Sequence, residues 1–534
     1  MNAKPFTKQA WANSSTVSHW LKFLCIFLLV LGICFRFVNL GQKVYWKDEA
    51  YTSLWLSGHS RTEIIASIFN GQTLRASDIS KYQFPSPNRN ALDTVKQLAT
   101  NDPQHPPLYY LLGWFWLKIF GTSIATLRSL SAFLSLLIFP SLYWLCRELF
   151  GLAVPGWTAI ALFAVSPFHV LYAQEAREYS LWTAIVVLCS AALLSALRQQ
   201  TKVSWGVYSL TIVLGFYTCI LQGLVVVSHG LYVLLTQGWR LNKTWKAYLA
   251  SSLIAFVGFL PWLPYLKQID GVGWTATPIP LSAFIKIWAL NLSRLFLDVQ
   301  FSLKNPLTYL ILPILVLVGY SLYFVLRNAP KPTWLFIATL LGVTLFAFTA
   351  PDLIGGGRRS LINRYLIPCY IAIQLAVTYL LSVKIFAPKS DFPYFWRSLL
   401  AILVGLGIIS CATSTSATTW WHKYSSNANP AIARVINQSP HSLVISDSSF
   451  GEVLALSHLL EPDVKLRLTL EPQQPIVSQQ VIQEFSDVFL LEPSRNFRET
   501  LTQQAFHSQR VPRVQNLWHL EQGSSPKVPS DRSS

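Results

Sequence analysis

Long runs of apolar residues dominate this sequence and constrain its fold more than any other feature. A helix needs about 20 apolar residues to cross a bilayer core roughly 30 Å thick. Because lipid offers the backbone no hydrogen-bond partners, continuous apolar runs must be helical, whereas a membrane barrel needs alternating residues. We predict an all-α polytopic membrane bundle of about 11 transmembrane helices, near 20–39, 129–147, 152–172, 179–197, 203–220, 221–236, 247–266, 307–327, 334–350, 364–384 and 397–414.

The composition agrees with a membrane location. Charged residues make up 12% of the 534 residues and hydrophobic residues 52%, whereas a soluble domain has about 25% charged residues. The formal net charge is +18, but the basic residues are scattered over short loops and form no stripe with aromatic residues. We therefore expect membrane lipids as partners of these basic residues, and no nucleic acid.

The basic loops also predict the topology of the chain. If residues 1–19 are cytoplasmic and 106–121 only dips into the membrane, the later basic clusters all face the cytoplasm, as the positive-inside rule requires. A full span at 106–121 would put those clusters outside. We therefore predict an interfacial or re-entrant helix at 106–121 and an external first loop over 40–128, with basic cytoplasmic clusters at 198–202, 240–246, 327–331 and 384–397.

Beyond residue 420 the composition changes to that of a soluble domain. Short apolar strands alternate with helical patterns there, which predicts a small C-terminal α/β domain. We expect it on the extracytoplasmic side over 421–522, after a transmembrane domain over 20–420 and before a disordered tail at 523–534. The predicted strands are 441–447, 464–470 and 487–493, and the predicted helices are 451–461 and 496–506.

Two adjacent carboxylates, Asp48 and Glu49, follow the first span after only a few residues. Membrane insertion does not require them at the lipid–water boundary. Asp48 could cap the start of a helix, or it could act as a general base that orients an acceptor at the surface where a lipid-linked substrate presents its headgroup. Both readings remain open from the local sequence.

The end of the first loop carries His105, two prolines and then Tyr109. Prolines are typical of a helix start, and tyrosines are common anchors at a membrane interface. His105 could be a metal ligand, an acid–base group or an ordinary loop histidine. We take His105 and Tyr109 as candidate substrate-binding residues.

Several arginines lie on the external side, against the positive-inside bias. Such arginines would be explained by a phosphate bound near the membrane. Plain loops are the alternative for the glycine-rich segment at 355–357 and its neighbours. The candidate substrate-binding residues in these segments are Arg128, Arg177, Arg358, Arg364 and Tyr365.

Four of these segments, in this order, resemble a known family. DEAYT after the first span, HPPLYYLL at the end of the first loop, SPFHVLYAQEAREYSL and NRYLIP look like the bacterial relatives of protein O-mannosyltransferases and the lipid A aminoarabinose transferases. These proteins belong to the GT-C class of membrane glycosyltransferases. The resemblance covers roughly residues 20–385.

The resemblance implies a polyprenyl-phosphate-linked sugar donor, inversion at the anomeric carbon and an extracytoplasmic active site in a multi-pass protein of the cell membrane. It implies that Asp48 is the base, with Glu49 beside it. It also implies that the donor phosphate is contacted by Arg177, by Arg364 and by Arg358 or Arg359. Some relatives use a divalent metal and others do not, so a metal remains open here.

Two other classes of function compete with an enzyme. A polytopic lipid or solute transporter, or a flippase, would favour charged or broken helices at mid-membrane and internal symmetry, but the spans are almost free of charge and show no strong repeat. A non-catalytic membrane scaffold is the third class. The sugar, the acceptor and the oligomeric state are not determined by the sequence.

Overall fold

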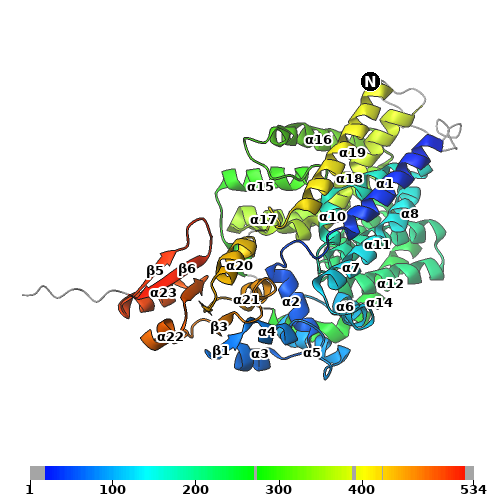
Figure 1. Ribbon diagram of the computed structural model, residues 1–534. Coiled ribbons are helices and arrows are strands. Elements are labelled where there is room, and N and C mark those ends of the chain that lie inside the picture. The colour runs from blue at the N-terminus through cyan, green and yellow to red at the C-terminus, as the bar shows by residue number, and fades with distance from the viewer. Residues whose placement is uncertain (1–18, 270–272, 388–391, 424, 523–534) are drawn as a thin grey trace, which may run out of the picture. The chain divides into compact units, whose positions relative to one another are not determined.

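The structure is a computed structural model that describes residues 19–269, 273–387, 392–423 and 425–522 (Figure 1). The predicted cytoplasmic N-terminus and the predicted disordered tail fall, apart from residue 19, outside the described residues. The chain forms two compact units. The first comprises residues 1–40, 98–113 and 125–416, and the second comprises 41–97, 114–124 and 417–534.

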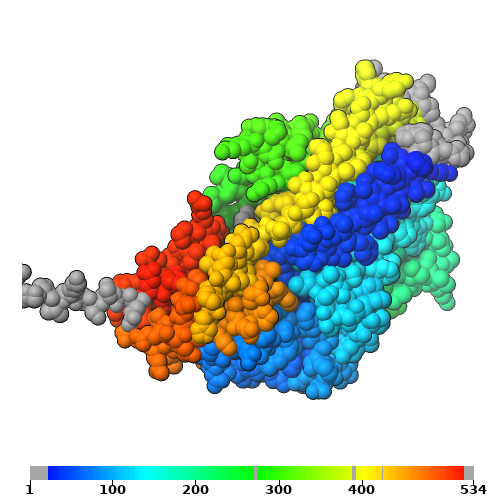
Figure 2. All heavy atoms as spheres, in the orientation of Figure 1, coloured from blue at the N-terminus to red at the C-terminus, as the bar shows by residue number. Residues whose placement is uncertain are grey.

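The first unit is a bundle of helices whose centre is α18. This helix is buried along its whole apolar length and packs against α9, α16, α17 and α19, while α11 packs against α8 and α12. A helix that is apolar all round is expected at such a centre. On the outside, α1 and α19 lie side by side (Figure 2).

The helices of the first unit are α1 (His19–Phe37), α6 (Leu108–Phe120, shared with the second unit), α7 (Ile124–Ser135), α8 (Ile138–Phe150), α9 (Ala153–Ala164), α10 (Pro167–Ala173), α11 (Tyr179–Gln199), α12 (Lys202–Thr218), α13 (Gln222–Gln237), α14 (Lys243–Phe259), α15 (Leu281–Ser293), α16 (Ile311–Asn328), α17 (Lys331–Gly355), α18 (Ile367–Phe386) and α19 (Pro393–Ser416). Short 3-10 helices are η4 (Leu260–Gln268), η5 (Gly273–Ala276), η6 (Pro306–Leu310), η7 (Arg359–Leu361) and η8 (Asn363–Leu366).

The all-α bundle is confirmed, but the count of eleven spans is not. Every predicted span is helical. Within the described residues, however, 7 helices are long and apolar enough to cross a membrane, or up to 8 if the bent pair α9–α10 is one span. The predicted spans outside that set are α1, α12 and α13. Two of them are short, since α12 has 17 residues and α13 has 16.

The bent pair α9–α10 leaves backbone carbonyl groups free at its break, and a neighbouring helix satisfies them. The helices meet at 63°, because Pro167 has no N–H to continue the ladder and disfavours a helical residue before it. Arg36 of α1 donates to the carbonyl oxygen of Ala164 at 2.7 Å. Gly32 and Gly407 let α1 and α19 approach, since a Cβ on either would lie 2.3 Å or 2.4 Å from a carbonyl oxygen of the break.

The second unit is built on a six-stranded sheet in the order β1-β3-β2-β4-β6-β5. Its strands are β1 (Thr73–Arg75), β2 (Ser442–Ser446), β3 (Lys465–Leu468), β4 (Asp487–Leu491), β5 (Phe506–Arg510) and β6 (Leu517–Gln522). Its helices are α2 (Lys47–Leu56), α3 (Arg61–Ile68), α4 (Ala76–Ile79), η3 (Ser80–Tyr82), α5 (Ala91–Asn101, whose last residues lie in the first unit), α20 (Asn429–Gln438), α21 (Phe450–Ser457), α22 (Gln479–Glu484) and α23 (Arg495–Gln503).

The predicted small α/β fold is confirmed, and the first loop contributes to it. The central strand β2 pairs in parallel with β3 and β4, and all five of its residues are buried. β1, which comes from the first loop, pairs antiparallel with β3, with Leu74 opposite Leu466. β5 and β6 pair antiparallel with each other, and β6 also pairs antiparallel with β4.

Candidate active site

The polar connection between α10 and α11 meets the end of the first loop inside the first unit. His105 precedes the two prolines that lead into α6, and its Nδ1 lies 2.8 Å from Oε1 of Glu178. Nη2 of Arg177 lies 3.0 Å from Nε2 of the same imidazole. Arg177 and Glu178 are 2% and 1% exposed. These two adjacent residues therefore form a buried ion pair that contacts His105.

These contacts define the hydrogen-bonding state of the histidine. An arginine can only donate, and a carboxylate accepts. Nδ1–H of His105 therefore donates to Glu178. Nη2 of Arg177 lies close to both ring nitrogens, 3.0 Å from Nε2 and 3.2 Å from Nδ1, so the guanidinium lies against the imidazole and His105 helps to hold it in place.

Glu178 is a buried anion. Burial by itself would raise the pKa of its carboxyl, but Arg177 and His105 outweigh this effect and lower the pKa to about 2. Oε2 of Glu178 also lies 3.4 Å from Nε of Arg177. The charged carboxylate of Glu178 therefore holds the guanidinium of Arg177 in place. The other N–H groups of this guanidinium are oriented by their own hydrogen-bond partners.

Two tyrosines complete the surroundings of the guanidinium. Nη1 of Arg177 donates to the hydroxyl oxygen of Tyr110 at 3.2 Å. The ring of Tyr179 has the guanidinium of Arg177 at 5.6 Å and that of Arg364 at 5.7 Å. Two guanidinium groups thus share one aromatic ring, beside the carboxylate of Glu178.

The two other candidate residues nearby, Tyr109 and Arg128, have different contacts. The Tyr109 hydroxyl lies 2.7 Å from the Ser131 hydroxyl, which donates to the main-chain oxygen of Arg177 at 3.3 Å. Arg128 is buried and donates to the main-chain oxygen of Leu40 at 2.7 Å. The structure therefore places Tyr109 in contact with the cluster, while this contact of Arg128 anchors the chain just after α1.

The glycine-rich segment holds its two arginines in other contacts. Arg358 donates to the main-chain oxygen of Trp274 at 3.1 Å and lies over its ring at 5.1 Å. Arg359 pairs with the buried Asp352 at 3.1 Å. Tyr365 stacks on Phe348 at 5.3 Å. Of the predicted arginines, Arg364 shares an aromatic partner, the ring of Tyr179, with Arg177.

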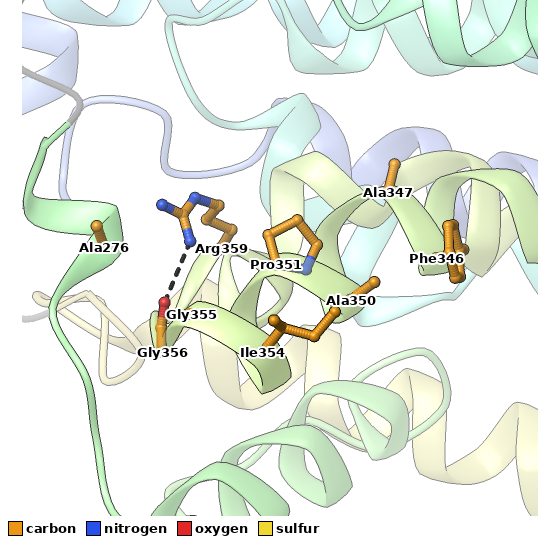
Figure 3. Close-up of a pocket in the computed structure, with 9 residues that line it drawn as sticks. All are labelled: Ala276, Phe346, Ala347, Ala350, Pro351, Ile354, Gly355, Gly356 and Arg359. Carbon is orange, nitrogen blue, oxygen red and sulfur yellow. Dashed lines mark hydrogen bonds between the residues drawn. The ribbon is translucent and has the colours of Figure 1, made fainter.

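An open apolar groove of about 500 Å³ follows the C-terminal half of α17 (Figure 3). Its wall is made by Phe346, Ala347, Ala350, Pro351 and Ile354, and Arg359 closes one end, where it donates to the carbonyl oxygen of Gly356 at 3.4 Å. An apolar wall that ends at a guanidinium suits a ligand with a hydrocarbon chain and an anionic head.

The predicted carboxylate pair belongs to the second unit, in the first turn of α2. Glu49 is fully buried, and its Oε2 accepts the N–H of Trp46, the residue before the helix, at 3.3 Å. Asp48 is partly exposed. The helix start is therefore capped by Glu49 and not by Asp48, which removes the capping role considered for Asp48.

The α2 helix is fixed by α21 of the same unit. Lys47 lies 3.7 Å from a carboxylate oxygen of Glu452, and Ser426 donates to the other oxygen at 3.0 Å. Gly451 lets the helices touch, because a Cβ there would lie 2.6 Å from a side-chain carbon of Lys47. The α/β part of the chain thus sets the position of the turn that carries Asp48.

The described residues contain no group of three or more His, Cys, Asp or Glu side chains arranged to hold a metal ion. The divalent metal stays open, as the resemblance left it, and the contacts of His105 in this cluster are those to Glu178 and Arg177.

Sequence reasoning did not select Glu178 or Tyr110 as site residues. Both are adjacent to chosen residues, Glu178 to Arg177 and Tyr110 to Tyr109. Adjacency was the available signal, but only the folded chain shows which neighbour points inward. Arg36 was missed for another reason: it lies within an apolar helix, where no partner for a charge is visible in sequence.

Comparisons with known proteins bear on this arrangement. The family model described as dolichyl-phosphate-mannose-protein mannosyltransferase matches residues 104–265, which include His105, Arg177 and Glu178. The crystal structure of ArnT from Cupriavidus metallidurans bound to undecaprenyl phosphate is 13% identical, with a TM-score of 0.54 over 95% of this chain and 98% of that chain. Its apo state is 14% identical, with a TM-score of 0.50 over 94% and 97%.

A third structure, the Archaeoglobus fulgidus oligosaccharyltransferase tethered with an acceptor peptide, is 12% identical with a TM-score of 0.48 over 93% of this chain and 70% of that chain. That likeness is too low to add weight. No curated protein matches the sequence.

The fold is that of the GT-C class of membrane glycosyltransferases. The resemblance that the four motifs predicted, to relatives of protein O-mannosyltransferases and aminoarabinose transferases, is confirmed by the family model over residues 104–265 and by the fold.

Proposed function

We propose that this protein is a membrane glycosyltransferase that moves a sugar from a polyprenyl-phosphate donor to an acceptor on the extracytoplasmic face of the cell membrane. The observation that carries the proposal is the buried guanidinium of Arg177, held by His105 and Glu178 in a fold of the GT-C class. The similar ArnT structure is bound to undecaprenyl phosphate, an anionic lipid of the proposed kind.

The arginines would bind the phosphate of the donor. Charge-assisted hydrogen bonds from guanidinium groups are the strong contacts for phosphate. Arg177 is pre-oriented by Glu178, and Arg364 shares the Tyr179 ring with it. Positive charge at this place would stabilise the phosphate as negative charge develops on it in the transition state.

The groove along α17 would take part of the polyprenyl chain. Its wall is apolar and its guanidinium, Arg359, stands at one end. Exposed Ile354 and Phe346 lie on this wall, and apolar side chains that face lipid cost nothing in a membrane. A donor drawn from the bilayer would therefore meet an apolar surface before its phosphate is bound.

Asp48 would act as the base. In the proposed step an acceptor hydroxyl or amine attacks the anomeric carbon, and Asp48 takes its proton. The new bond forms as the bond from that carbon to the phosphate oxygen breaks, and the electron pair leaves with polyprenyl phosphate. The configuration inverts. Because the leaving group is already an anion, no general acid is needed.

The test is sugar transfer from a radiolabelled polyprenyl-phosphate hexose by the purified, full-length protein. We expect release of sugar from the lipid, which neither a transporter nor a scaffold would produce. Asp48→Asn should lower the rate by about 10²-fold or more, as loss of a general base does. Asp463→Asn, at a carboxylate that is 92% exposed, is the matched control.

The outcomes separate the classes. Sugar release by the wild type and by Asp463→Asn but not by Asp48→Asn supports the enzyme and its base. Release that is unchanged in a correctly inserted Asp48→Asn variant would remove Asp48 from the mechanism. Transmembrane movement of intact lipid-linked sugar without release would favour the flippase alternative.

A further inference from the structure

A second groove lies far along the chain from the residues above, between the N-terminal ends of α12 and α14. Its volume is about 690 Å³, within the range of small-molecule sites. The two helices pack together, and Ser209 of α12 donates to the main-chain oxygen of Ser251 of α14 at 3.0 Å. Lys202 and Lys243 lie at its polar end, and Gly206, Ala250 and Ile254 line its apolar part.

The two lysines occupy positions where positive charge is unfavourable by itself. Each is the first residue of its helix, at the positive end of the helix dipole, and neither first turn contains an acidic residue. Among the described residues, no ion pair involves Lys202 or Lys243, whereas the neighbouring Arg198 is paired with Glu148 at 2.8 Å. Uncompensated positive charge therefore collects at one end of the groove.

The helix caps leave backbone donors at the same end. Thr201 accepts the N–H of Ser204 at 3.1 Å, and Asn242 accepts the N–H of Trp245 at 2.9 Å. These caps satisfy the third N–H of each helix, and the first two N–H groups of a helix have no intrahelical acceptor. Together with the lysines they favour an anion such as a phosphate diester.

Trp205 also lines the groove. Its side chain is 7% exposed, and its indole nitrogen is buried away from the groove. The indole therefore contributes its apolar ring to the wall, next to Gly206.

We propose that this groove binds one anionic glycerophospholipid, with its phosphate at Lys202 and Lys243 and an acyl chain along Gly206, Ala250 and Ile254. Charge complementarity selects this occupant: the polar end is cationic without a carboxylate partner, and the apolar part includes Ile254, which is 64% exposed. The predicted topology puts both lysines at the cytoplasmic leaflet, where anionic lipids attract basic residues. The site is separate from the proposed sugar transfer.

The test is native mass spectrometry of the purified, full-length protein titrated with phosphatidylglycerol or with phosphatidylcholine of the same acyl chains. We expect one phosphatidylglycerol to bind more tightly than phosphatidylcholine. Lys202→Gln with Lys243→Gln should weaken phosphatidylglycerol by roughly 30-fold, equivalent to about 1 kcal/mol for each lysine near a membrane surface. Lys202→Arg with Lys243→Arg should keep most of the affinity.

A second variant tests the apolar part without changing charge. A Cβ on Gly206 would meet nothing within 4 Å, so Gly206→Leu should fold and fill the groove, and it should weaken both lipids. Gly319→Leu, also in open space on a helix, and Lys331→Gln, at the first residue of α17, are the matched controls. Equal affinity for the two lipids would overturn the proposal, and so would wild-type binding by the Lys202→Gln, Lys243→Gln double variant or by Gly206→Leu.

Discussion

Nδ1 of His105 lies 2.8 Å from Oε1 of Glu178, while Nε2 of the same ring lies 3.0 Å from Nη2 of Arg177. One imidazole thus links a buried anion to a buried cation across 73 residues of sequence. The arrangement makes His105 a positioning residue in the proposed reaction, because its ring holds Glu178 by a hydrogen bond and lies against the guanidinium of Arg177.

His105→Ala should lower kcat/KM for the lipid-linked sugar by about 10²-fold, the scale found when one oriented donor to a developing anion is lost. The main change should be in transfer rate. Partial recovery is expected with His105→Asn, because an amide can donate to Glu178 and accept from Arg177. His507→Ala, at an exposed histidine of the second unit, is the control. If His105→Asn were no better than His105→Ala, orientation of Arg177 would not be the role of His105.

Arg36→Met should lower the unfolding temperature of the protein in detergent. Arg36 donates to the carbonyl oxygens of Gly32, Phe163 and Ala164, and a buried carbonyl left without a donor costs about 1–3 kcal/mol. Arg36→Lys should lose less, because an ammonium still donates. Arg327→Met, at an exposed arginine, should have little effect. An unchanged melting temperature for Arg36→Met would show that the break between α9 and α10 does not depend on this side chain.

Gly451→Ala should reduce sugar transfer without abolishing the fold. The added Cβ would come within 2.6 Å of Lys47 and 2.7 Å of the Tyr51 ring, so α2 must move, and with it Asp48. We expect the rate to fall by about 10-fold or more, as small displacements of catalytic groups do. Gly405→Ala, where nothing lies within 4 Å, is the control. Full activity in Gly451→Ala would mean that the contact between α2 and α21 does not position Asp48.

The pH dependence of stability should differ in sign between Glu452 and Glu63. Burial, with a further contribution from Glu492, raises the pKa of Glu452 above 4.5. The folded state then binds more protons than the unfolded state, so this carboxyl costs stability as the pH rises from about 4.5 through its raised pKa. Glu452→Gln should therefore flatten the fall in unfolding temperature between pH 4.5 and 7.

Glu63 supplies the opposite case in the same unit. The backbone N–H of Ser60, followed by Arg89, lowers the pKa of Glu63 below 4.5. Its contribution to stability is therefore present above pH 4.5 and is lost as the pH falls through the lowered pKa. Glu63→Gln should reduce stability at pH 7 and change it little at low pH. Parallel pH profiles for the two variants would contradict both assignments.

Much of the fold follows from local sequence. The apolar runs predicted a helix at each of the eleven spans, and the short strands 441–447, 464–470 and 487–493 all form the sheet. These elements depend on residues close in sequence. The count of eleven spans differs from the 7 or 8 of the structure for another reason: α1, α12 and α13 fall outside that set, and α12 and α13 have only 17 and 16 residues. Hydropathy over a window does not fix where each helix begins and ends.

The candidate site was predicted in part. Polar residues at the ends of apolar segments are costly to bury, and this guided the choice of His105, Tyr109 and Arg177. The structure brings these three residues together. Glu178 and Tyr110 were not selected, because nothing in sequence shows which of several adjacent polar side chains faces inward.

The sequence by itself determined the membrane bundle, the three strands β2, β3 and β4 of the six-stranded sheet, and the motifs that carry the resemblance, since periodicity and apolar length act over neighbouring residues. Only the tertiary structure decided that His105 binds Arg177 and Glu178, that Arg36 satisfies the broken span, and that β1 joins β3 from almost 400 residues away. Contacts of this kind depend on which surfaces meet when the chain folds. A buried charge or an unpaired carbonyl is costly unless it has a partner, and here the partners are too far away in sequence to be predicted from it.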